Sequence, residues 1–319
     1  MSGGSYGTVK ATLRLGECQF YFADKATRER FRPVLETFVR SPESLPGYQP
    51  VQAKKDRPAY VFRFQIGEQS YVAKLSRAHT VLDRVSNFLR PPKALKAWYN
   101  SNRLRALGID TPKVVAFGKR RTAGLLRRSI LIAEEVRDAW KLHQFLYRYC
   151  VAPNSAPLRR RLMRLLGQTL GRLHAAGIHH SDFRSANLLV QQNGADIKLY
   201  VVDTEPIRFP RPLMDAQRLR DLTTLDFTFA KGITVTDRMR GFRAYADALG
   251  LNRADRKAWL RKTIAACERS MHTKIHKPQL RPYRIPSGLK YREQVKVITD
   301  ILEPRLREKA KKSKFFDDD

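Results

Sequence analysis

The chain has 319 residues, of which 42% are hydrophobic and 10% aromatic, enough for packed cores and too many for a disordered chain. Lys and Arg number 62 against 30 Asp and Glu, a surplus of 32 positive charges that favours polyanionic partners: nucleic acid, an anionic membrane surface, or a phosphorylated or acidic-sugar substrate. The three cysteines form no CxxC pair and no apolar run approaches the length of a membrane span, which excludes zinc ribbons, disulfide frameworks and transmembrane helices and predicts a cytoplasmic protein.

The first predicted strands follow a loop at residues 40–58, which contains four prolines and Gly47. Residues 59–66 and 70–75 are rich in β-branched and aromatic side chains, and a short segment with a glycine separates them. This pattern predicts a β-hairpin with Lys74 on its second strand.

A helix and a further strand pair are predicted next. The apolar residues of 93–107 recur at helical spacing, and Gly108 ends the pattern. Residues 113–117 and 129–134 then have the composition of strands.

A second helix is predicted at residues 158–176, where leucines recur at helical spacing until Gly177. This helix leads directly into a polar loop at residues 179–187. Two short apolar runs joined by an Asn-Gly turn follow and predict a second hairpin. The hairpin has Asn187 and Asp203 at its outer ends, and the chain beyond it is mostly helical in pattern from residue 214 to 310.

The loop before the second hairpin has the spacing HxDxxxxN, from His180 to Asn187. Phosphoryl transfer needs a carboxylate that orients the attacking hydroxyl, oxygen ligands that hold Mg²⁺ against the nucleotide phosphates, and a cation that meets the charge on the moving group. We assign these roles to Asp182 as catalytic base, to Asn187 and Asp203 as metal ligands, and to Arg184 as the cation. Lys74, on an upstream strand, is the predicted contact to the α and β phosphates.

His180 is predicted to fix the backbone of the loop rather than to transfer protons. Residues 4–8 resemble the end of a phosphate-binding loop, but Gly7 precedes Lys74 by 67 residues, too far for two strands flanking such a loop. We therefore expect a mobile N-terminal segment there. The turn that covers the phosphates is expected within residues 47–58, although this stretch shows no glycine motif.

Five stretches together resemble the lipopolysaccharide kinase family of the Kdo/WaaP type. They lie between about residues 60 and 270 and are residues 107–118, the HxDxxxxN loop, residues 199–203, residues 218–222 and residues 236–245. The resemblance implies an α+β, two-lobed protein-kinase-like fold, with a small β-rich N-lobe at residues 1–136, a larger helical C-lobe at 137–304 and a basic tail at 305–319. It also implies ATP with Mg²⁺ as the phosphate donor and a heptose or Kdo hydroxyl of the lipopolysaccharide inner core as the acceptor.

By the same resemblance, Asp221 would brace the catalytic loop; an exposed helical aspartate beside two arginines is the alternative. The sequence also departs from kinase patterns. The helix after Lys74 has no acidic residue at 93–102 to pair with the lysine, and Asn100 is the substitute we suggest. Asp203 is followed by Thr-Glu rather than by Phe-Gly, so an activation segment of the protein-kinase sort is not predicted.

The positive charge is expected to steer the enzyme to an anionic glycolipid on the cytoplasmic face of the inner membrane. The residues suggested for this contact are Arg159–Arg161, Arg208, Arg211 and the cations of residues 305–314. Two alternatives remain: a kinase acting on a protein or another small molecule, and a basic pseudokinase that binds an anionic partner without catalysis. No RNA- or DNA-binding motif is present in the sequence, and no nucleic-acid partner is expected.

Overall fold

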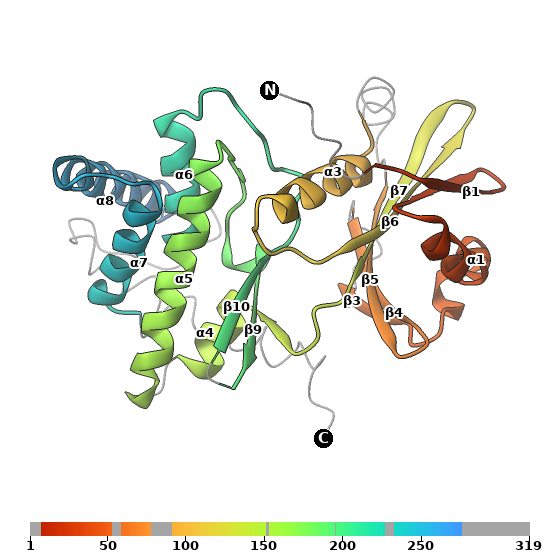
Figure 1. Cartoon of the computed structure of the whole chain (residues 1–319), viewed down its shortest axis with the longest axis horizontal. Helices are drawn as coiled ribbons and strands as arrows, with labels where there is room; N and C mark the ends of the chain where they lie inside the picture. Colours follow the sequence, from red (N-terminus) through yellow and green to blue (C-terminus); the bar gives the residue numbers. More distant parts are fainter. Residues whose placement is uncertain are drawn as a thin grey trace. The chain divides into compact units, whose positions relative to one another are not determined.

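The computed structural model describes residues 8–52, 59–77, 91–150, 153–194, 196–226 and 233–275 (Figure 1). The chain forms two compact units. The first contains Met1–Arg137 together with Val201–Pro206, and the second contains Asp138–Tyr200 together with Ile207–Asp319. Every helix in the described part of the chain is too short or too polar to span a bilayer.

The first unit is built on a seven-stranded sheet in which every neighbouring pair of strands is antiparallel. In spatial order its strands are β1 (Ala11–Leu15), β2 (Cys18–Phe22), β6 (Val114–Thr122), β7 (Leu125–Glu134), β5 (Gln69–Arg77), β4 (Ala59–Ile66) and β3 (Gln49–Gln52). The β4–β5 hairpin lies where the sequence predicts it, and β6 and β7 are longer than the predicted strand pair.

Among the described residues, each face of this sheet packs against a helix, because consecutive side chains of a strand point to opposite faces. Phe20 and Phe22 of β2 belong to a core cluster with Phe31 and Leu35 of α1 (Lys25–Arg40). Tyr21, which lies between them, belongs to a second cluster with Trp98 and Ala94 of α3 (Lys93–Ala106). The sheet therefore lies between α1 and α3.

The sequence analysis missed β1, β2 and α1, and it was wrong to treat residues 40–58 as loop throughout. Helix α1 begins after Asp24, whose carboxylate accepts a hydrogen bond from the Thr27 amide at 2.6 Å, as an N-cap does. Strand β3 occupies Gln49–Gln52 and lies at the edge of the sheet. Its Pro50 is tolerated there, because an edge strand need not donate every backbone N–H. Residues 1–7 and 53–58, which include most of the phosphate-loop-like stretch and part of the expected phosphate-covering turn, lie outside the described residues.

The second unit combines a small sheet with the larger helices. The sheet has the order β10-β9-β8; along the chain, α4 and α5 lie between β8 and β9, and α6, α7 and α8 follow β10. The strands are β8 (Ala139–Lys141), β9 (Leu188–Asn193) and β10 (Asp196–Val201), and the helices are α4 (Leu142–Tyr149), α5 (Ala156–Ala175), α6 (Asp215–Asp226), α7 (Val235–Ala248) and α8 (Arg253–Ile275). The helical pattern beyond residue 275 lies outside the described residues.

Helices α5 and α7 cross at glycines, so that their backbones touch. A Cβ atom on Gly167 would lie 2.0 Å from the carbonyl oxygen of Gly241, and one on Gly171 would lie 2.5 Å from the Cβ of Ala248. Helix α5 is followed by Gly177 at φ 71°, the left-handed conformation that ends helices and that glycine adopts at low cost. This crossing fixes the helix from which the polar loop emerges.

Candidate functional site

The structure brings Asp182, Arg184 and Asn187 together in the loop after α5. Oδ2 of Asp182 accepts a hydrogen bond from Nδ2 of Asn187 at 2.8 Å and faces Nε of Arg184 at 3.1 Å. Asn187 Nδ2 also donates to the backbone oxygen of Asp182 at 3.0 Å, and Ser181 turns the loop with φ 57°. One oxygen of the carboxylate is therefore fixed from two sides.

The other oxygen of this carboxylate is available for chemistry. Oδ1 of Asp182 has no hydrogen-bond partner among the residues that the structure describes, and the side chain is 34% exposed. A carboxylate held through one oxygen can accept the proton of a hydroxyl through the other. Because Asn187 donates through Nδ2, its Oδ1 remains as an oxygen ligand for a hard cation.

A buried aspartate on α6 braces this loop. Asp221 is fully buried, and its Oδ2 accepts hydrogen bonds from Nδ1 of His179 at 3.0 Å, from the amide of His180 at 3.0 Å and from Nε2 of His174 at 3.3 Å. The side chain of His180 is also buried, with its ring edge-on to Phe183. Asp221 is therefore not the exposed helical residue of the alternative interpretation, and a role of His180 in fixing the loop backbone stays a prediction.

The protonation states of this network follow from burial and from its hydrogen bonds. Burial would raise the pKa of Asp221, but the hydrogen bonds from His174 and His179 outweigh it and lower the pKa to about 2. Burial lowers the pKa of His174 and raises the pKa of Tyr245. We therefore assign a neutral His174 that donates through Nε2 to the aspartate and accepts through Nδ1 from the Tyr245 hydroxyl, 2.9 Å away.

We expect this histidine to make the protein less stable in mild acid. Its pKa in the folded chain is lowered below the ordinary value of 6.5, so below about pH 6.5 the unfolded chain binds a proton that the folded chain excludes. The free energy of unfolding should then fall as the pH decreases, by at most about 1.4 kcal/mol per pH unit for this one group. Urea unfolding at pH 7.5 and 5.5 measures the effect, and His174→Gln should reduce the difference between the two pH values. An equal pH difference in both proteins would contradict the assignment.

Lys74 and Asp203 form a second cluster, within the first unit. Nζ of Lys74 lies 2.5 Å from Oδ1 of Asp203, and both side chains are about 30% exposed (29% and 30%). Asp203 has φ 56°, a left-handed conformation that aspartate tolerates better than most residues. The lysine therefore neutralises the aspartate, and one carboxylate oxygen remains for a further cation.

Helix α3 holds the segment that follows Asp203. Nδ2 of Asn100 donates to the carbonyl oxygen of Thr204 at 2.7 Å, and the hydroxyls of Ser101 and Thr204 are 2.8 Å apart. The Thr204 hydroxyl also donates to the carbonyl oxygen of Ala97 at 3.1 Å. Asn100, suggested as a partner of the lysine, thus acts here on the backbone after the aspartate. Sequence reasoning missed Ser101 and Thr204, because neither belongs to a motif.

The structure places the seven predicted site residues in two groups. Lys74 and Asp203 meet in the first unit; the residues of the second unit are Asp182, Arg184, Asn187, His180 and Asp221. Within the described part of the chain, no group of three or more His, Cys, Asp or Glu residues could hold a metal ion.

Comparisons with known proteins identify the family. Residues 53–272 match the lipopolysaccharide kinase (Kdo/WaaP) family. A lipopolysaccharide core heptose(I) kinase WaaP from Escherichia coli is 28% identical over 57% of the chain and 72% of its own length. The WaaP of Pseudomonas aeruginosa is 26% identical over 48% of the chain and 59% of its own length.

The solved structures include a similar fold. A structure of WaaP in complex with acyl carrier protein matches with a TM-score of 0.51 and 23% identity, over 69% of this chain and 90% of that one. This match confirms the α+β, two-lobed protein-kinase-like fold predicted from the sequence.

Proposed function

Because the chain belongs to the lipopolysaccharide kinase (Kdo/WaaP) family and is therefore an ATP-dependent phosphotransferase with an alcohol as acceptor, we propose that it phosphorylates a sugar hydroxyl of the lipopolysaccharide inner core. The names of the curated relatives favour a heptose over Kdo as the acceptor sugar. The observation that carries the proposal is the Asp182 carboxylate, which is fixed through one oxygen by Asn187 and Arg184 and has its other oxygen available.

The residues of the loop supply orientation and charge. Asp182 accepts the proton of the attacking sugar hydroxyl through Oδ1 and points the hydroxyl oxygen at the γ-phosphate. Arg184 is 54% exposed, so it can turn from the carboxylate toward the charge that develops on the transferred group. Asp221 keeps the loop in place and takes no part in proton transfer.

Lys74, Asn187 and Asp203 are the proposed nucleotide and metal ligands. Lys74 contacts the α and β phosphates once they replace Asp203 as its anionic partner. Asn187 and Asp203 would hold Mg²⁺ through their side-chain oxygens, which are the ligands that this cation prefers. When bound, the cation neutralises the charge of the β and γ phosphates.

We expect Asp203→Ala to remove the dependence of ATP binding on Mg²⁺, because Asn187 carries no charge to balance the cation. Calorimetric titration with ATP, with and without Mg²⁺, gives the measurement. Asp196→Ala is the matched control, since it removes the same charge from an exposed position on β10 and should retain the wild-type difference. If Mg²⁺ tightens ATP binding equally in the Asp203 variant, Asp203 is not a metal ligand.

The function itself is tested by incubating the purified full chain with labelled ATP, Mg²⁺ and dephosphorylated lipopolysaccharide core. Mass spectrometry should show a gain of one phosphate on a core sugar, and Asp182→Asn, prepared in the same way, excludes a contaminating kinase. Transfer to peptides or aminoglycosides instead of the core would favour a kinase for another acceptor. ATP binding without transfer to any acceptor would favour the pseudokinase.

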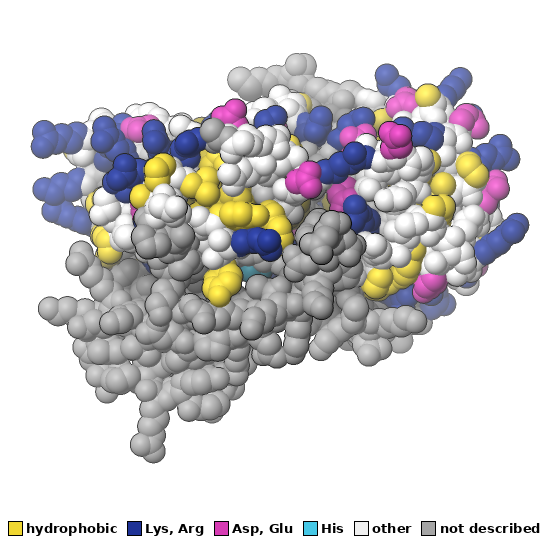
Figure 2. All heavy atoms as spheres, turned by 90° about the horizontal axis from the view of Figure 1, so that it is seen from below, with side chains coloured by type: hydrophobic (Ala, Val, Ile, Leu, Met, Phe, Trp, Pro, Cys, Tyr) yellow, Lys and Arg dark blue, Asp and Glu magenta, His cyan; other side chains and the backbone are white. Residues whose placement is uncertain are grey.

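The charge surplus supports a peripheral contact with the anionic cytoplasmic face of the inner membrane, as part of the same proposal. Figure 2 shows Lys and Arg side chains projecting from the described residues on one face of the molecule. Arg208 and Arg211 are exposed and remain candidates for this contact. Arg159 is not a candidate, because its side chain is only 14% exposed and lies against Asp237 and Ser155.

We expect truncation after Pro304 to weaken binding to anionic liposomes. It removes six cations and four acidic residues; the cations are clustered at residues 305–314, and each contributes about 1 kcal/mol near an anionic leaflet, over a screening length of about 8 Å at physiological salt. The removed cations are Arg305, Arg307, Lys309, Lys311, Lys312 and Lys314. Co-sedimentation across a salt series measures the effect, and turnover on a soluble, delipidated acceptor should change little. Unchanged, salt-insensitive liposome binding would contradict the role of the tail.

A further inference from the structure

Three arginines lie side by side across the sheet of the first unit. Arg77 of β5 is directly opposite Arg128 of β7, which in turn is directly opposite Arg120 of β6. Directly opposed residues of antiparallel strands point to the same face of a sheet, and like charges in such positions are destabilising. Repulsion within this row therefore lowers the stability of the sheet, and the fold of the unit gives no reason for placing three arginines there.

Only one arginine of the row has an acidic partner among the described residues. Arg120 lies 2.7 Å from Oε2 of Glu17, whereas no described carboxylate lies within ion-pair distance of Arg77 or Arg128. Burial and the neighbouring charges of Arg77 and Arg120 lower the pKa of Arg128. The pair formed by Arg77 and Arg128 thus presents two uncompensated positive charges.

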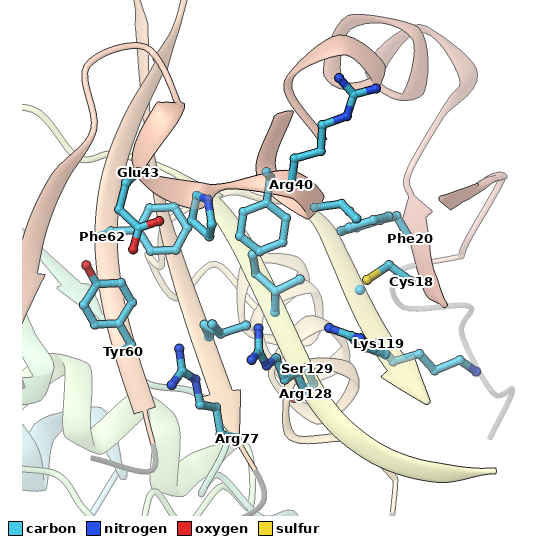
Figure 3. Close-up of a pocket in the computed structure, with 17 residues that line it drawn as sticks. Cys18, Phe20, Arg40, Glu43, Tyr60, Phe62, Arg77, Lys119, Arg128 and Ser129 are labelled. Atoms are coloured by element: carbon cyan, nitrogen blue, oxygen red, sulfur yellow. The ribbon is translucent and has the colours of Figure 1, made fainter. Parts of the chain in front are cut away.

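These two side chains border a cavity of about 290 Å³. Figure 3 shows Arg77 and Arg128 next to each other and directed into the cavity, while Lys119 extends away from it. The rest of the lining comes from the sheet, from the end of α1 and from the segment after it, and it includes the charged Arg40 and Glu43 and the apolar Phe20, Phe38, Phe62, Leu75 and Ile130. A Cβ on Gly118 would lie 2.6 Å from a ring carbon of Phe20, so the glycine allows this ring to approach the β6 backbone closely.

The cavity is separate from the proposed nucleotide lysine. Lys74 and Leu75 are consecutive residues of β5, so they point to opposite faces of the sheet. Leu75 lines the cavity and Lys74 contacts Asp203 on the other face. A ligand in the cavity would therefore leave the lysine accessible to ATP.

We propose that this cavity binds a phosphate monoester that carries an apolar group, with the phosphate on Arg77 and Arg128 and the apolar group against the aromatic lining. A phosphate monoester carries a charge of about −1.5 to −2 at pH 7, which matches the two uncompensated arginines, whereas a carboxylate would neutralise only one of them. Guanidinium groups bind phosphate through paired hydrogen bonds. The volume lies near the lower limit of small-molecule sites, about 300 Å³, and suits a head group with the first part of a chain.

Calorimetry on the full chain tests the proposal with a phosphate monoester and with its two parts taken separately. They are octanoyl lysophosphatidic acid below its aggregation concentration, inorganic phosphate, and the uncharged octanoylglycerol. We expect the lysophosphatidic acid to bind most tightly, and Arg77→Gln/Arg128→Gln to weaken it by about 10²-fold or more, because two charge-assisted contacts are lost. Arg253→Gln/Arg261→Gln removes the same charge from exposed positions on α8 and should bind as the wild type does.

Two further measurements show whether the lysophosphatidic acid binds in this cavity rather than elsewhere on the protein. Arg77→Lys/Arg128→Lys retains the charge without the paired geometry and should show an intermediate affinity for lysophosphatidic acid. Because it keeps both charges, this variant also tests the proposal if the glutamine variant fails to fold. Cys18 faces the cavity (Figure 3), while Cys150 and Cys267 are buried, so the rate of maleimide labelling at Cys18 reports occupancy directly. Lysophosphatidic acid should slow this labelling and octanoylglycerol should not.

Three outcomes would overturn the proposal. They are equal affinity for inorganic phosphate and lysophosphatidic acid, unchanged affinity in the glutamine variant, and labelling of Cys18 that lysophosphatidic acid does not slow. Binding to phosphatidic acid vesicles without binding to the soluble lipid would show a surface effect and would also overturn it. None of these measurements uses catalysis, so the outcome is independent of the proposed kinase activity.

Discussion

Asp182→Asn should lower turnover by about 10²-fold or more, because a positioned general base contributes at least that much. The side chain accepts one hydrogen bond from Asn187 and faces Arg184 through Oδ2, and an asparagine oxygen can keep these contacts. The fold and the affinity for ATP should therefore stay close to those of the wild type. Steady-state kinetics on the soluble acceptor, together with calorimetric titration of ATP, separate the two effects.

The matched control is Asp196→Asn, which makes the same chemical change at an exposed position of β10. It should leave both turnover and ATP affinity unchanged. Turnover at the wild-type level in Asp182→Asn would remove this residue from the mechanism, and a loss of ATP affinity equal to the loss of turnover would assign it to binding instead.

Asp221→Ala should reduce the free energy of unfolding by about 3–5 kcal/mol, the usual cost of removing one partner from a buried charged network. The carboxylate accepts three hydrogen bonds, from His174, His179 and the amide of His180. All three donors would be left without this acceptor in a dry interior, where each lost contact is costly. Urea unfolding at pH 7.5 provides the measurement.

A second aspartate on the same helix separates this effect from the loss of a charge. Asp215 is 55% exposed and lies 2.9 Å from Lys262, so Asp215→Ala should cost less than about 1 kcal/mol, as exposed ion pairs do. Asp221→Asn keeps one acceptor oxygen and should fall between the two alanine variants. Equal stabilities of the two alanine variants would show that the buried network does not hold the loop.

The elements nearest the site were predictable because local patterns specify them. The β4–β5 hairpin, α3, α5 and the strands that follow the loop lie close to the predicted ranges. The HxDxxxxN spacing was sufficient to select Asp182 and Asn187 as site residues, and residues five apart in one loop can meet whatever the rest of the fold is.

The elements that the sequence analysis missed have mixed local signals. Pro33 lies within α1, and charged residues surround the helical spacing of Phe31 and Leu35, although this spacing and the Asp24 cap were readable signals. Pro50 made β3 resemble a loop, because the position of a strand at the edge of a sheet is a tertiary property.

Contacts between distant segments could not be predicted from spacing. The convergence of His174, His179 and His180 on Asp221 depends on how α6 packs beside the end of α5. The row formed by Arg77, Arg128 and Arg120 depends on strand register, since a shift by one residue would turn each side chain to the other face.

The glycine crossing of α5 and α7 has a consequence for the order in which the protein folds. Gly167 and Gly171 lie within α5 and Gly241 lies within α7, and each costs an isolated helix about 1 kcal/mol relative to alanine. These helices therefore gain stability mainly by packing on each other. Helix α7 ends at Ala248, well after the loop at residues 179–187 in the order of synthesis. The ribosome must release the chain through α7 before α5 is firmly held, so during translation the loop that carries Asp182 should become ordered only after α7 has been made.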